Sequence, residues 1–211
     1  MGAKLTQAKL TQANLTEANL NRANLIEAKL NGAVLIEANL NGAKLDGAKL
    51  NGAGLNRANL NRANLNGANL NGAQLWKANL IEANLIEANL NEANLIRADL
   101  NRANLIEASL NRANLIEANL NRADLNRAKL NGANLNRANL IGANLNRAVG
   151  LNPERIKSAC FWEKAIHTQA KWDFDKELWV AEDREANQRE IEKLKRDKNS
   201  DPRNPINCNT K

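Results

Sequence analysis

The chain has 211 residues, with 30 Lys and Arg against 23 Asp and Glu, a formal net charge of +7 and an isoelectric point near 9.6. Hydrophobic residues make up 43% of the chain, but aromatic residues make up only 3% and tyrosine is absent. This composition excludes a conventional globular core of mixed side-chain shapes and charge-driven disorder, and no apolar run approaches the roughly 18 residues of a transmembrane helix.

A repeat of five residues accounts for this composition. From Ala3 to Ala148 every fifth residue is alanine, and from Leu5 to Leu145 every fifth residue is leucine. Five residues advance an α-helix by about 500°, so successive leucines would not form a stripe, and strand alternation would put Leu5 and Leu10 on opposite faces. Alanine and leucine two residues apart do share one face of an extended segment, so a bend in each unit brings every pair back inside. The pattern predicts a coiled solenoid with short extended sides and tight turns.

The run A-N-L-I-E-A-N-L-N-R at residues 113–122 resembles the pentapeptide-repeat family, whose units read A-(D/N)-L-x-x. The resemblance covers residues 3 to about 150 and implies an all-β solenoid, a right-handed quadrilateral β-helix with four units per coil and a narrow core of Leu and Ala. Unlike the family pattern, the central leucine never gives way to phenylalanine, so we expect a uniform core. Residues 1–150 are therefore expected to form about seven coils, a rod on the order of 35 Å long. The expected core positions include Leu65, Leu70, Leu85, Ala83 and Ala103.

Residues twenty apart stack along such a coil, so the outward side chains fall into columns. The column after Leu10 carries asparagine at every twentieth residue from 31 to 131, which predicts amide ladders. Isoleucine replaces asparagine in other columns, either because β-branched residues suit exposed strands or because they form an apolar docking strip. Trp76 is the one aromatic residue of the repeat region. The candidate contacts for a partner are Trp76, Ile81, Ile86, Ile96 and Ile106.

The charge of the repeat region bears on its function. Residues 1–150 carry 17 Lys and Arg against 11 Asp and Glu, a net charge of +6. The resemblance implies that family members which bind DNA gyrase imitate duplex DNA with an acidic surface. A basic rod therefore disfavours a DNA-shape mimic that regulates gyrase or another topoisomerase, which stays the alternative function. Direct binding of nucleic acid is also not favoured, because Glu82 interrupts the arginine columns and almost no aromatic residue is interleaved with them.

The repeat stops at Gly150, and a different kind of sequence follows. Asn152 and Pro153 are typical of the start of a helix, and apolar residues then recur at helical spacing. The segment from Gly150 to Ala165 resembles the C-terminal end of bacterial, often cyanobacterial, pentapeptide-repeat proteins. We expect residues 151–198 to form an α-helical cap and charged helix that covers the open end of the solenoid. The expected cap residues are Ile156, Cys160, Phe161, Trp162, Ile166, Trp172 and Trp179.

Within this C-terminal region a second helix is expected from about Asp173 to Lys198, and residues 199–211 are expected to be a disordered tail. The chain has two cysteines, Cys160 and Cys208, which are too few for a disulfide framework and lack the C-x-x-C spacing. We interpret Cys160 as an apolar residue of the cap and Cys208 as a free thiol.

Nothing in the sequence indicates catalysis. His167 is the one histidine and has no evident metal or nucleophile partner, and neither a P-loop nor a dinucleotide fingerprint is present. We therefore expect no cofactor and predict a non-enzymatic structural or binding scaffold for an unknown protein partner. A cytoplasmic location is expected because no signal segment precedes the first repeat in the sequence given, and whether an upstream segment is missing stays open. A membrane partner is not expected, self-association through an end coil or the C-terminal helix stays open, and binding to a regular surface lattice is a remoter third function.

Overall fold

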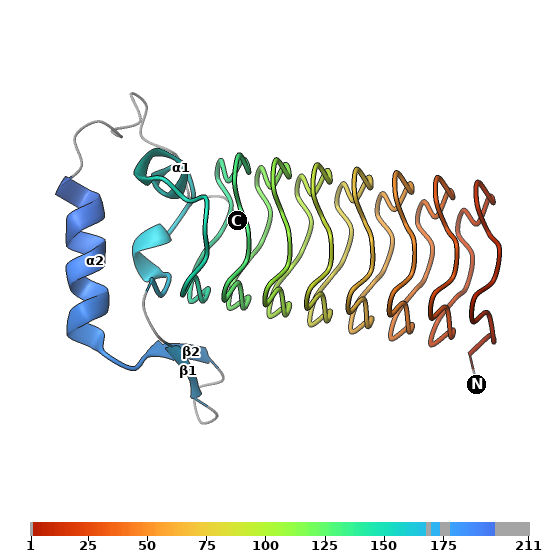
Figure 1. The fold of residues 1–211 in the computed structure, drawn as a ribbon, viewed down its shortest axis with the longest axis horizontal. Helices are drawn as coiled ribbons and strands as arrows, with labels where there is room; N and C mark the ends of the chain where they lie inside the picture. Colours follow the sequence, from red (N-terminus) through yellow and green to blue (C-terminus); the bar gives the residue numbers. More distant parts are fainter. Residues whose placement is uncertain (1, 168–169, 174–177, 197–211) are drawn as a thin grey trace.

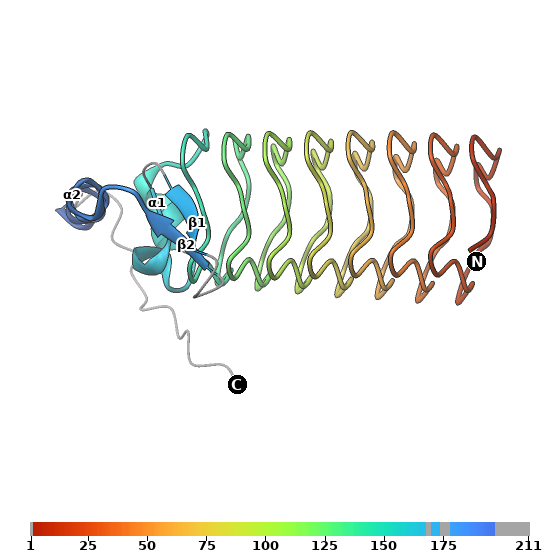
Figure 2. The same ribbon diagram turned by 90° about the horizontal axis from the view of Figure 1, so that it is seen from below.

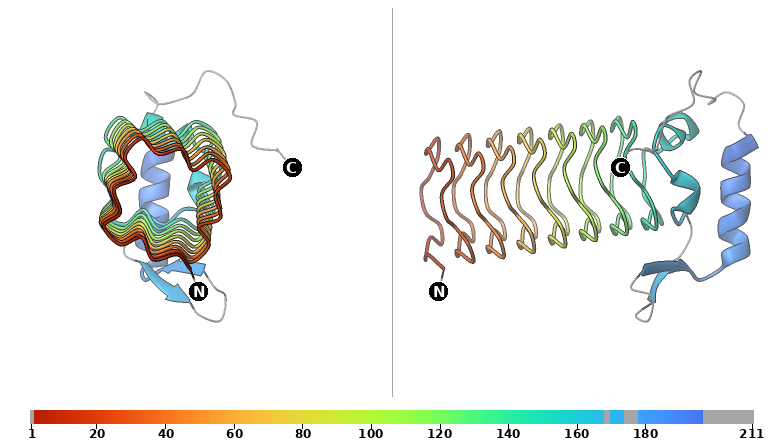
Figure 3. Two further views of the ribbon diagram at one scale, coloured as in Figure 1. Left: turned by 90° about the vertical axis from the view of Figure 1, so that its right-hand side faces the viewer. Right: turned by 180° about the vertical axis from the view of Figure 1, so that it is seen from behind.

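The computed structural model describes residues 2–167, 170–173 and 178–196. Residues 3–149 form a straight stack of coils, with the N-terminus at one end and the remaining helices and strands gathered at the other (Figure 1). A perpendicular view shows the same straight stack (Figure 2). Seen along its axis, the solenoid has a four-sided outline (Figure 3). We number the faces 1 to 4 after Leu5, Leu10, Leu15 and Leu20, and each later leucine belongs to the face of the leucine twenty residues before it.

Each pentapeptide leads into the next through a tight turn. The amide of Ala8 donates to the carbonyl of Leu5 at 3.1 Å, and the same bond recurs along the solenoid. The third residue of the turn has a positive φ, 55° at Gln7, as in a type II β-turn. Glycine takes this position 8 times, whereas glutamate, arginine, glutamine or lysine takes it 21 times. Left-handed backbone costs a non-glycine residue about 1–2 kcal/mol, so the stacked coils must hold these turns in place.

The backbone joins neighbouring coils on every side. The amide of Lys44 donates to the carbonyl of Ala23 at 2.9 Å, and the amide of Leu25 donates to the carbonyl of Lys44 at 2.7 Å. The residue before each leucine thus forms a parallel bridge with the residue twenty positions on, in an unbroken series from Lys4 to Val149. Because each coil supplies the hydrogen-bond partners of the next, the twenty-residue register cannot slip.

The core of the solenoid consists of the leucines and alanines of the repeat. From Leu20 to Leu145 every one of them is at most 6% exposed. The core positions expected from the repeat are at most 1% exposed: Leu65, Leu70, Leu85, Ala83 and Ala103. The leucines of the first coil, such as Leu5, are only partly buried, because no described coil covers them.

Asparagine before the leucine has a structural role of its own. The side-chain oxygen of Asn84 accepts the backbone N–H of Ile86 at 3.2 Å, and the same contact two residues on recurs along the solenoid. Such contacts tie the turn to the strand that leads into it. The expected amide ladder on face 2 is present between some neighbours, because the amide of Asn51 donates to Asn31 Oδ1 at 2.6 Å.

The C-terminal region continues the last coil with a changed backbone path. Helix α1 (Pro153–Lys157) begins where the sequence indicates, and the side chain of Asn152 accepts the N–H of Arg155 at 2.8 Å. The 3-10 helix η1 (Trp162–Lys164) follows. Parallel bridges from Asn139 to Cys160 and from Asn144 to Ile166 extend the backbone ladder into this region.

The remaining elements correct one expectation. Strands β1 (Ala170–Asp173) and β2 (Leu178–Ala181) form an antiparallel hairpin, in which the backbone of Trp172 lies opposite that of Trp179. Helix α2 is Arg184–Arg196 and lies across the end of the solenoid beyond α1 (Figure 1). The helix expected from Asp173 is therefore wrong in its first part, because backbone pairing between two strands replaces helical bonds before residue 184.

Several expected cap residues pack onto the solenoid. Ile156 and Trp162 are 2% and 8% exposed and join the leucines and alanines in one apolar cluster. Ile191 of α2, which is not one of the expected cap residues, joins the same cluster and is 4% exposed. Ile166 is buried, and Phe161 is half-buried with a positive φ of 58°. The side chains of two other expected cap residues, Trp172 and Trp179, lie outside the described part of the structure.

Cys160 differs from its interpretation as a simple apolar residue. It is 5% exposed and disulfide-bonded. Cys208 and the expected disordered tail at 199–211 lie outside the described residues.

Candidate interaction surfaces

Trp76 lies in the turn that follows face 3. Isoleucine occupies the same turn position on other coils, at multiples of twenty residues before and after Trp76. We call this column the Trp76 edge: Ile36, Trp76, Ile96 and Ile116. Ile36 is 37% exposed, and the other three are half-buried. The edge is therefore an apolar line along the solenoid rather than a broad apolar patch.

Trp76 contacts side chains of its own coil and of the preceding coil. Its backbone N–H donates to the side chain of Asn56 at 3.1 Å, one coil away. The ammonium of Lys77 lies 4.6 Å and the guanidinium of Arg57 5.1 Å from the ring centroid. Two cation–π contacts, each worth about 0.5–1 kcal/mol at an exposed site, restrain the ring.

The five predicted contact residues do not share one edge. Trp76 and Ile96 lie on the Trp76 edge, but Ile86 and Ile106 lie in the turn after face 1, and Ile81 lies in the turn after face 4. Faces 1 and 3 are opposite sides of the solenoid, so a single flat partner cannot contact all five. The most exposed isoleucine of the edge, Ile36, was not among the predicted contacts, although the twenty-residue spacing indicates it.

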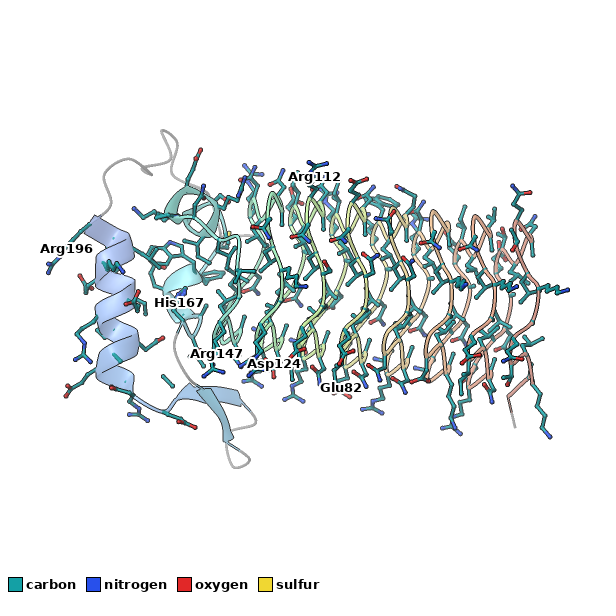
Figure 4. The ribbon with its side chains drawn as sticks, viewed as in Figure 1. Glu82, Arg112, Asp124, Arg147, His167 and Arg196 are labelled. Atoms are coloured by element: carbon teal, nitrogen blue, oxygen red, sulfur yellow. The ribbon has the colours of Figure 1, made fainter. Side chains whose placement is uncertain are left out.

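Several of the charged side chains in the turns are paired between coils. Seven ion pairs join turn residues that are twenty apart. Glu82 contacts Arg62 at 2.7 Å and Arg102 at 3.8 Å, so the glutamate that interrupts the arginine column pairs with both of its arginine neighbours. The hydrogen bond from Arg97 lowers the pKa of Glu117. Glu82 and Arg112 project from opposite sides of the solenoid (Figure 4).

Face 2 carries a different arrangement of charge at its N-terminal end. Lys9, Lys29 and Lys49 stand on three successive coils, joined by parallel bridges, and we call them the lysine ladder. All three are exposed, and none takes part in an ion pair within the described part of the chain. They line a hollow of about 600 Å³ together with Gln7, Glu27 and Gly47.

Two titratable groups near the C-terminal end are shielded from solvent: Asp124 is buried, and His167 is half-buried. Asp124 is 5% exposed and accepts the side-chain amide of Asn144 at 2.9 Å. Burial raises the pKa of the Asp124 carboxyl, against the lowering effect of its hydrogen bonds. Burial lowers the pKa of His167, whose Nε2 lies 3.1 Å from the carbonyl of Trp162. His167 lies between the solenoid and α2 (Figure 4).

The surroundings of the two groups differ from those of a metal site. Among the described residues, no group of three or more His, Cys, Asp or Glu is arranged to hold a metal ion. Within the same residues no helix is long and apolar enough to cross a membrane. The ring of Trp162 meets that of His167 edge-on at 6.4 Å, and Asn187 of α2 accepts the backbone N–H of His167 at 2.7 Å. The histidine is thus part of the packing between the cap and α2.

Comparison with protein families accounts for this architecture. The model of pentapeptide repeats matches residues 58–97, 78–115 and 108–147, and the model of the pentapeptide repeat region matches residues 1–75. The chain belongs to the pentapeptide-repeat family. The fold of this family is a right-handed β-helix solenoid, and its members are generally non-enzymatic structural or binding proteins.

Solved pentapeptide-repeat proteins include several from cyanobacteria. HetL from Nostoc sp. strain PCC 7120, described as involved in the regulation of heterocyst differentiation, is 38% identical, with a TM-score of 0.61 over 81% of this chain and 78% of HetL. Rfr23 from the cyanobacterium Cyanothece 51142 is 40% identical, with a TM-score of 0.41 over 48% of this chain and 62% of that one. The comparison with curated proteins gave no significant match.

A plant protein is also similar. The pentapeptide-repeat protein from the thylakoid lumen of Arabidopsis thaliana is 31% identical, with a TM-score of 0.37 over 47% of this chain and 66% of that one.

Proposed function

We propose that this pentapeptide-repeat protein is a non-enzymatic scaffold that binds a protein partner through the surface of its rod. The observation that carries the proposal is the Trp76 edge, where the one aromatic side chain of the repeat region is half-buried and restrained between two cations. Restrained aromatic side chains contribute strongly to binding because little conformational freedom is lost when a partner covers them.

The rest of the fold supports a scaffold role. Four units per coil and about seven coils make a rod whose outward residues keep a regular spacing along each face. Residues 151–196 serve, in this proposal, as a cap that keeps a second chain from stacking on the last coil. A cytoplasmic location is part of the proposal and is tested by cell fractionation.

Affinity capture with three variants tests the proposal. Wild-type protein, Trp76→Ala and Ile141→Ala are used as baits, and Ile141 is the control because it occupies the same turn position on face 4. We expect Trp76→Ala to lose a partner that wild type and Ile141→Ala retain, and the purified partner to bind the wild-type rod directly. Identical partners for all three baits would show that the Trp76 edge is not the binding site.

The alternative, a duplex mimic that regulates gyrase, is tested separately. The net charge of +6 over residues 1–150 argues against it, because DNA-binding surfaces of topoisomerases attract negative charge. We expect no inhibition and no protection of gyrase in a supercoiling assay. Inhibition that survives Trp76→Ala would replace the scaffold proposal with the mimic.

A further inference from the structure

The lysine ladder contrasts with the turn columns in which a glutamate on one coil pairs with an arginine on the next. Seven ion pairs between neighbouring coils place a glutamate beside an arginine. At the N-terminal end of face 2 the arrangement is the reverse, since Lys9, Lys29 and Lys49 face one another across successive bridges. Like charges directly opposite each other in paired strands are destabilising.

Each lysine of the ladder also replaces a residue that would support the fold. Two coils further along the same column stands Asn89, whose side-chain oxygen accepts the backbone N–H of Asn91 at 3.1 Å. Lysine has no acceptor and cannot make this contact. The ladder therefore weakens the solenoid through repulsion and through the loss of turn contacts, and the fold does not explain three consecutive lysines.

The turns beside the ladder leave it uncovered. Gly47 lines the hollow on one side, and Gly52 occupies the next turn of the same coil. A Cβ atom at Gly52 would meet nothing within 4 Å, and Gln12 has a similar φ of 59° in the same column. Space does not require glycine at position 52, although its φ of 63° favours glycine, and the absence of a side chain there leaves the turn beside the ladder uncovered.

The hollow is suited to an anionic ligand. Its lining contains three lysines and one glutamate, a net charge of +2, and Glu27 is already engaged by the side-chain amide of Gln7 at 2.8 Å. Successive coils are about 4.8 Å apart, so the ladder spans about 10 Å along the rod. In an extended peptide, alternate side chains lie about 6.6 Å apart, so three of them span about 13 Å, and flexible lysine side chains can meet carboxylates at that spacing.

We propose that the lysine ladder and its hollow bind an acidic peptide segment of a partner protein, extended along the rod axis, with carboxylates at alternate positions. A peptide is favoured over nucleic acid because face 2 has no aromatic residue on which a base could stack, and three cations give a phosphate backbone few contacts. This inference rests on the proposed scaffold function for its choice of a protein ligand. It concerns a different face from the Trp76 edge.

Fluorescence anisotropy with a labelled peptide tests the site. The probe is an eight-residue peptide of alternating Glu and Ser, and the same peptide with Gln in place of Glu is the control ligand. We expect the full chain to bind the Glu peptide, not the Gln peptide, and to release it as salt rises from about 0.05 M to about 0.5 M, because exposed charges are then screened. Absence of binding of the Glu peptide to the wild-type chain overturns the proposal.

Variants assign the binding to the ladder. Lys29→Asn should weaken binding about twofold to fivefold, the range for an exposed ion pair, and the triple variant of Lys9, Lys29 and Lys49 to Asn should abolish it. Lys129→Asn is the matched control, because Lys129 lies on the same column without a lysine on the adjacent coil, and it should bind as wild type does. Gly52→Gln should also weaken binding without any change of charge.

Stability separates a ligand site from a structural role. Since asparagine suits this column, the triple variant should melt at the wild-type temperature or above while it fails to bind. Unchanged affinity in the triple variant, or tighter binding of a 12-residue single-stranded DNA than of the Glu peptide at equal ionic strength, overturns the proposal. The peptide assay needs no cellular partner, so its failure and the failure of the Trp76 capture experiment are separate results.

Discussion

Replacing Leu85 by alanine tests how the core holds the coils together. Leu85 is fully buried, and the backbone around it is fixed on both sides, since its amide donates to Asn104 at 2.7 Å and the amide of Asn84 donates to Ala63 at 2.9 Å. The substitution removes three carbon atoms at about 0.8 kcal/mol each, about 2.4 kcal/mol in all. Each 40 Å³ or so of cavity that remains adds about 1 kcal/mol.

Because the two neighbouring coils prevent collapse, we expect Leu85→Ala to lower the free energy of unfolding by about 3–4 kcal/mol. Urea titration followed by circular dichroism measures the change. If the slope of the unfolding free energy against urea concentration is the same as in wild type, the coils still unfold together. Leu5→Ala is the matched control, because Leu5 occupies the same face in the first coil and is only partly buried. Equal losses for the two variants would refute the reasoning, since the core would then not depend on enclosure between coils.

Three further predictions concern packing, charge and the cap. Ala103→Leu should overpack the core and lower the unfolding free energy by about 1–3 kcal/mol in the same titration, and no change would mean that the alanine columns have spare room. The raised pKa of Asp124 means that its contribution to stability is greatest at acid pH and is lost as pH rises through the raised value. Asp124→Asn should therefore raise the melting temperature at pH 7 and have little effect near pH 3, and a lower melting temperature at pH 7 would contradict this. Deleting residues 151–211 should expose the last coil and cause aggregation, measured by sedimentation, and a soluble monomer would show that the cap is not needed.

The inward positions could be predicted because the repeat admits only Ala and Leu there. Leu70 is 1% exposed and Ala83 is 0% exposed. This agrees with the prediction that the Ala and Leu of every unit point into the core. The prediction of four units, or twenty residues, per coil came from the family resemblance, since five-residue periodicity alone does not indicate how many sides a coil has.

Features that depend on the neighbouring coil could not be predicted from local sequence. Arg62 and Glu82 are far apart in the chain, and their ion pair follows only once the twenty-residue register is known. Local propensity also misleads at Arg62, which takes a left-handed backbone, φ 55°, that glycine ordinarily occupies. Similarly, Asp173 looked like the start of a helix, but the pairing of β1 with β2 outweighed that local signal.

The twenty-residue register has a consequence for how such a protein can change. A deletion of one pentapeptide keeps every Ala and Leu in its inward position, so the core and the backbone bridges are restored at the next coil. All later residues, however, move round the rod by one face. Such a deletion between Lys49 and Trp76 would shift the indole from the turn after face 3 to the turn after face 2, in line with the column that follows the ladder. Loss or gain of single units can therefore recombine binding surfaces without redesigning the interior.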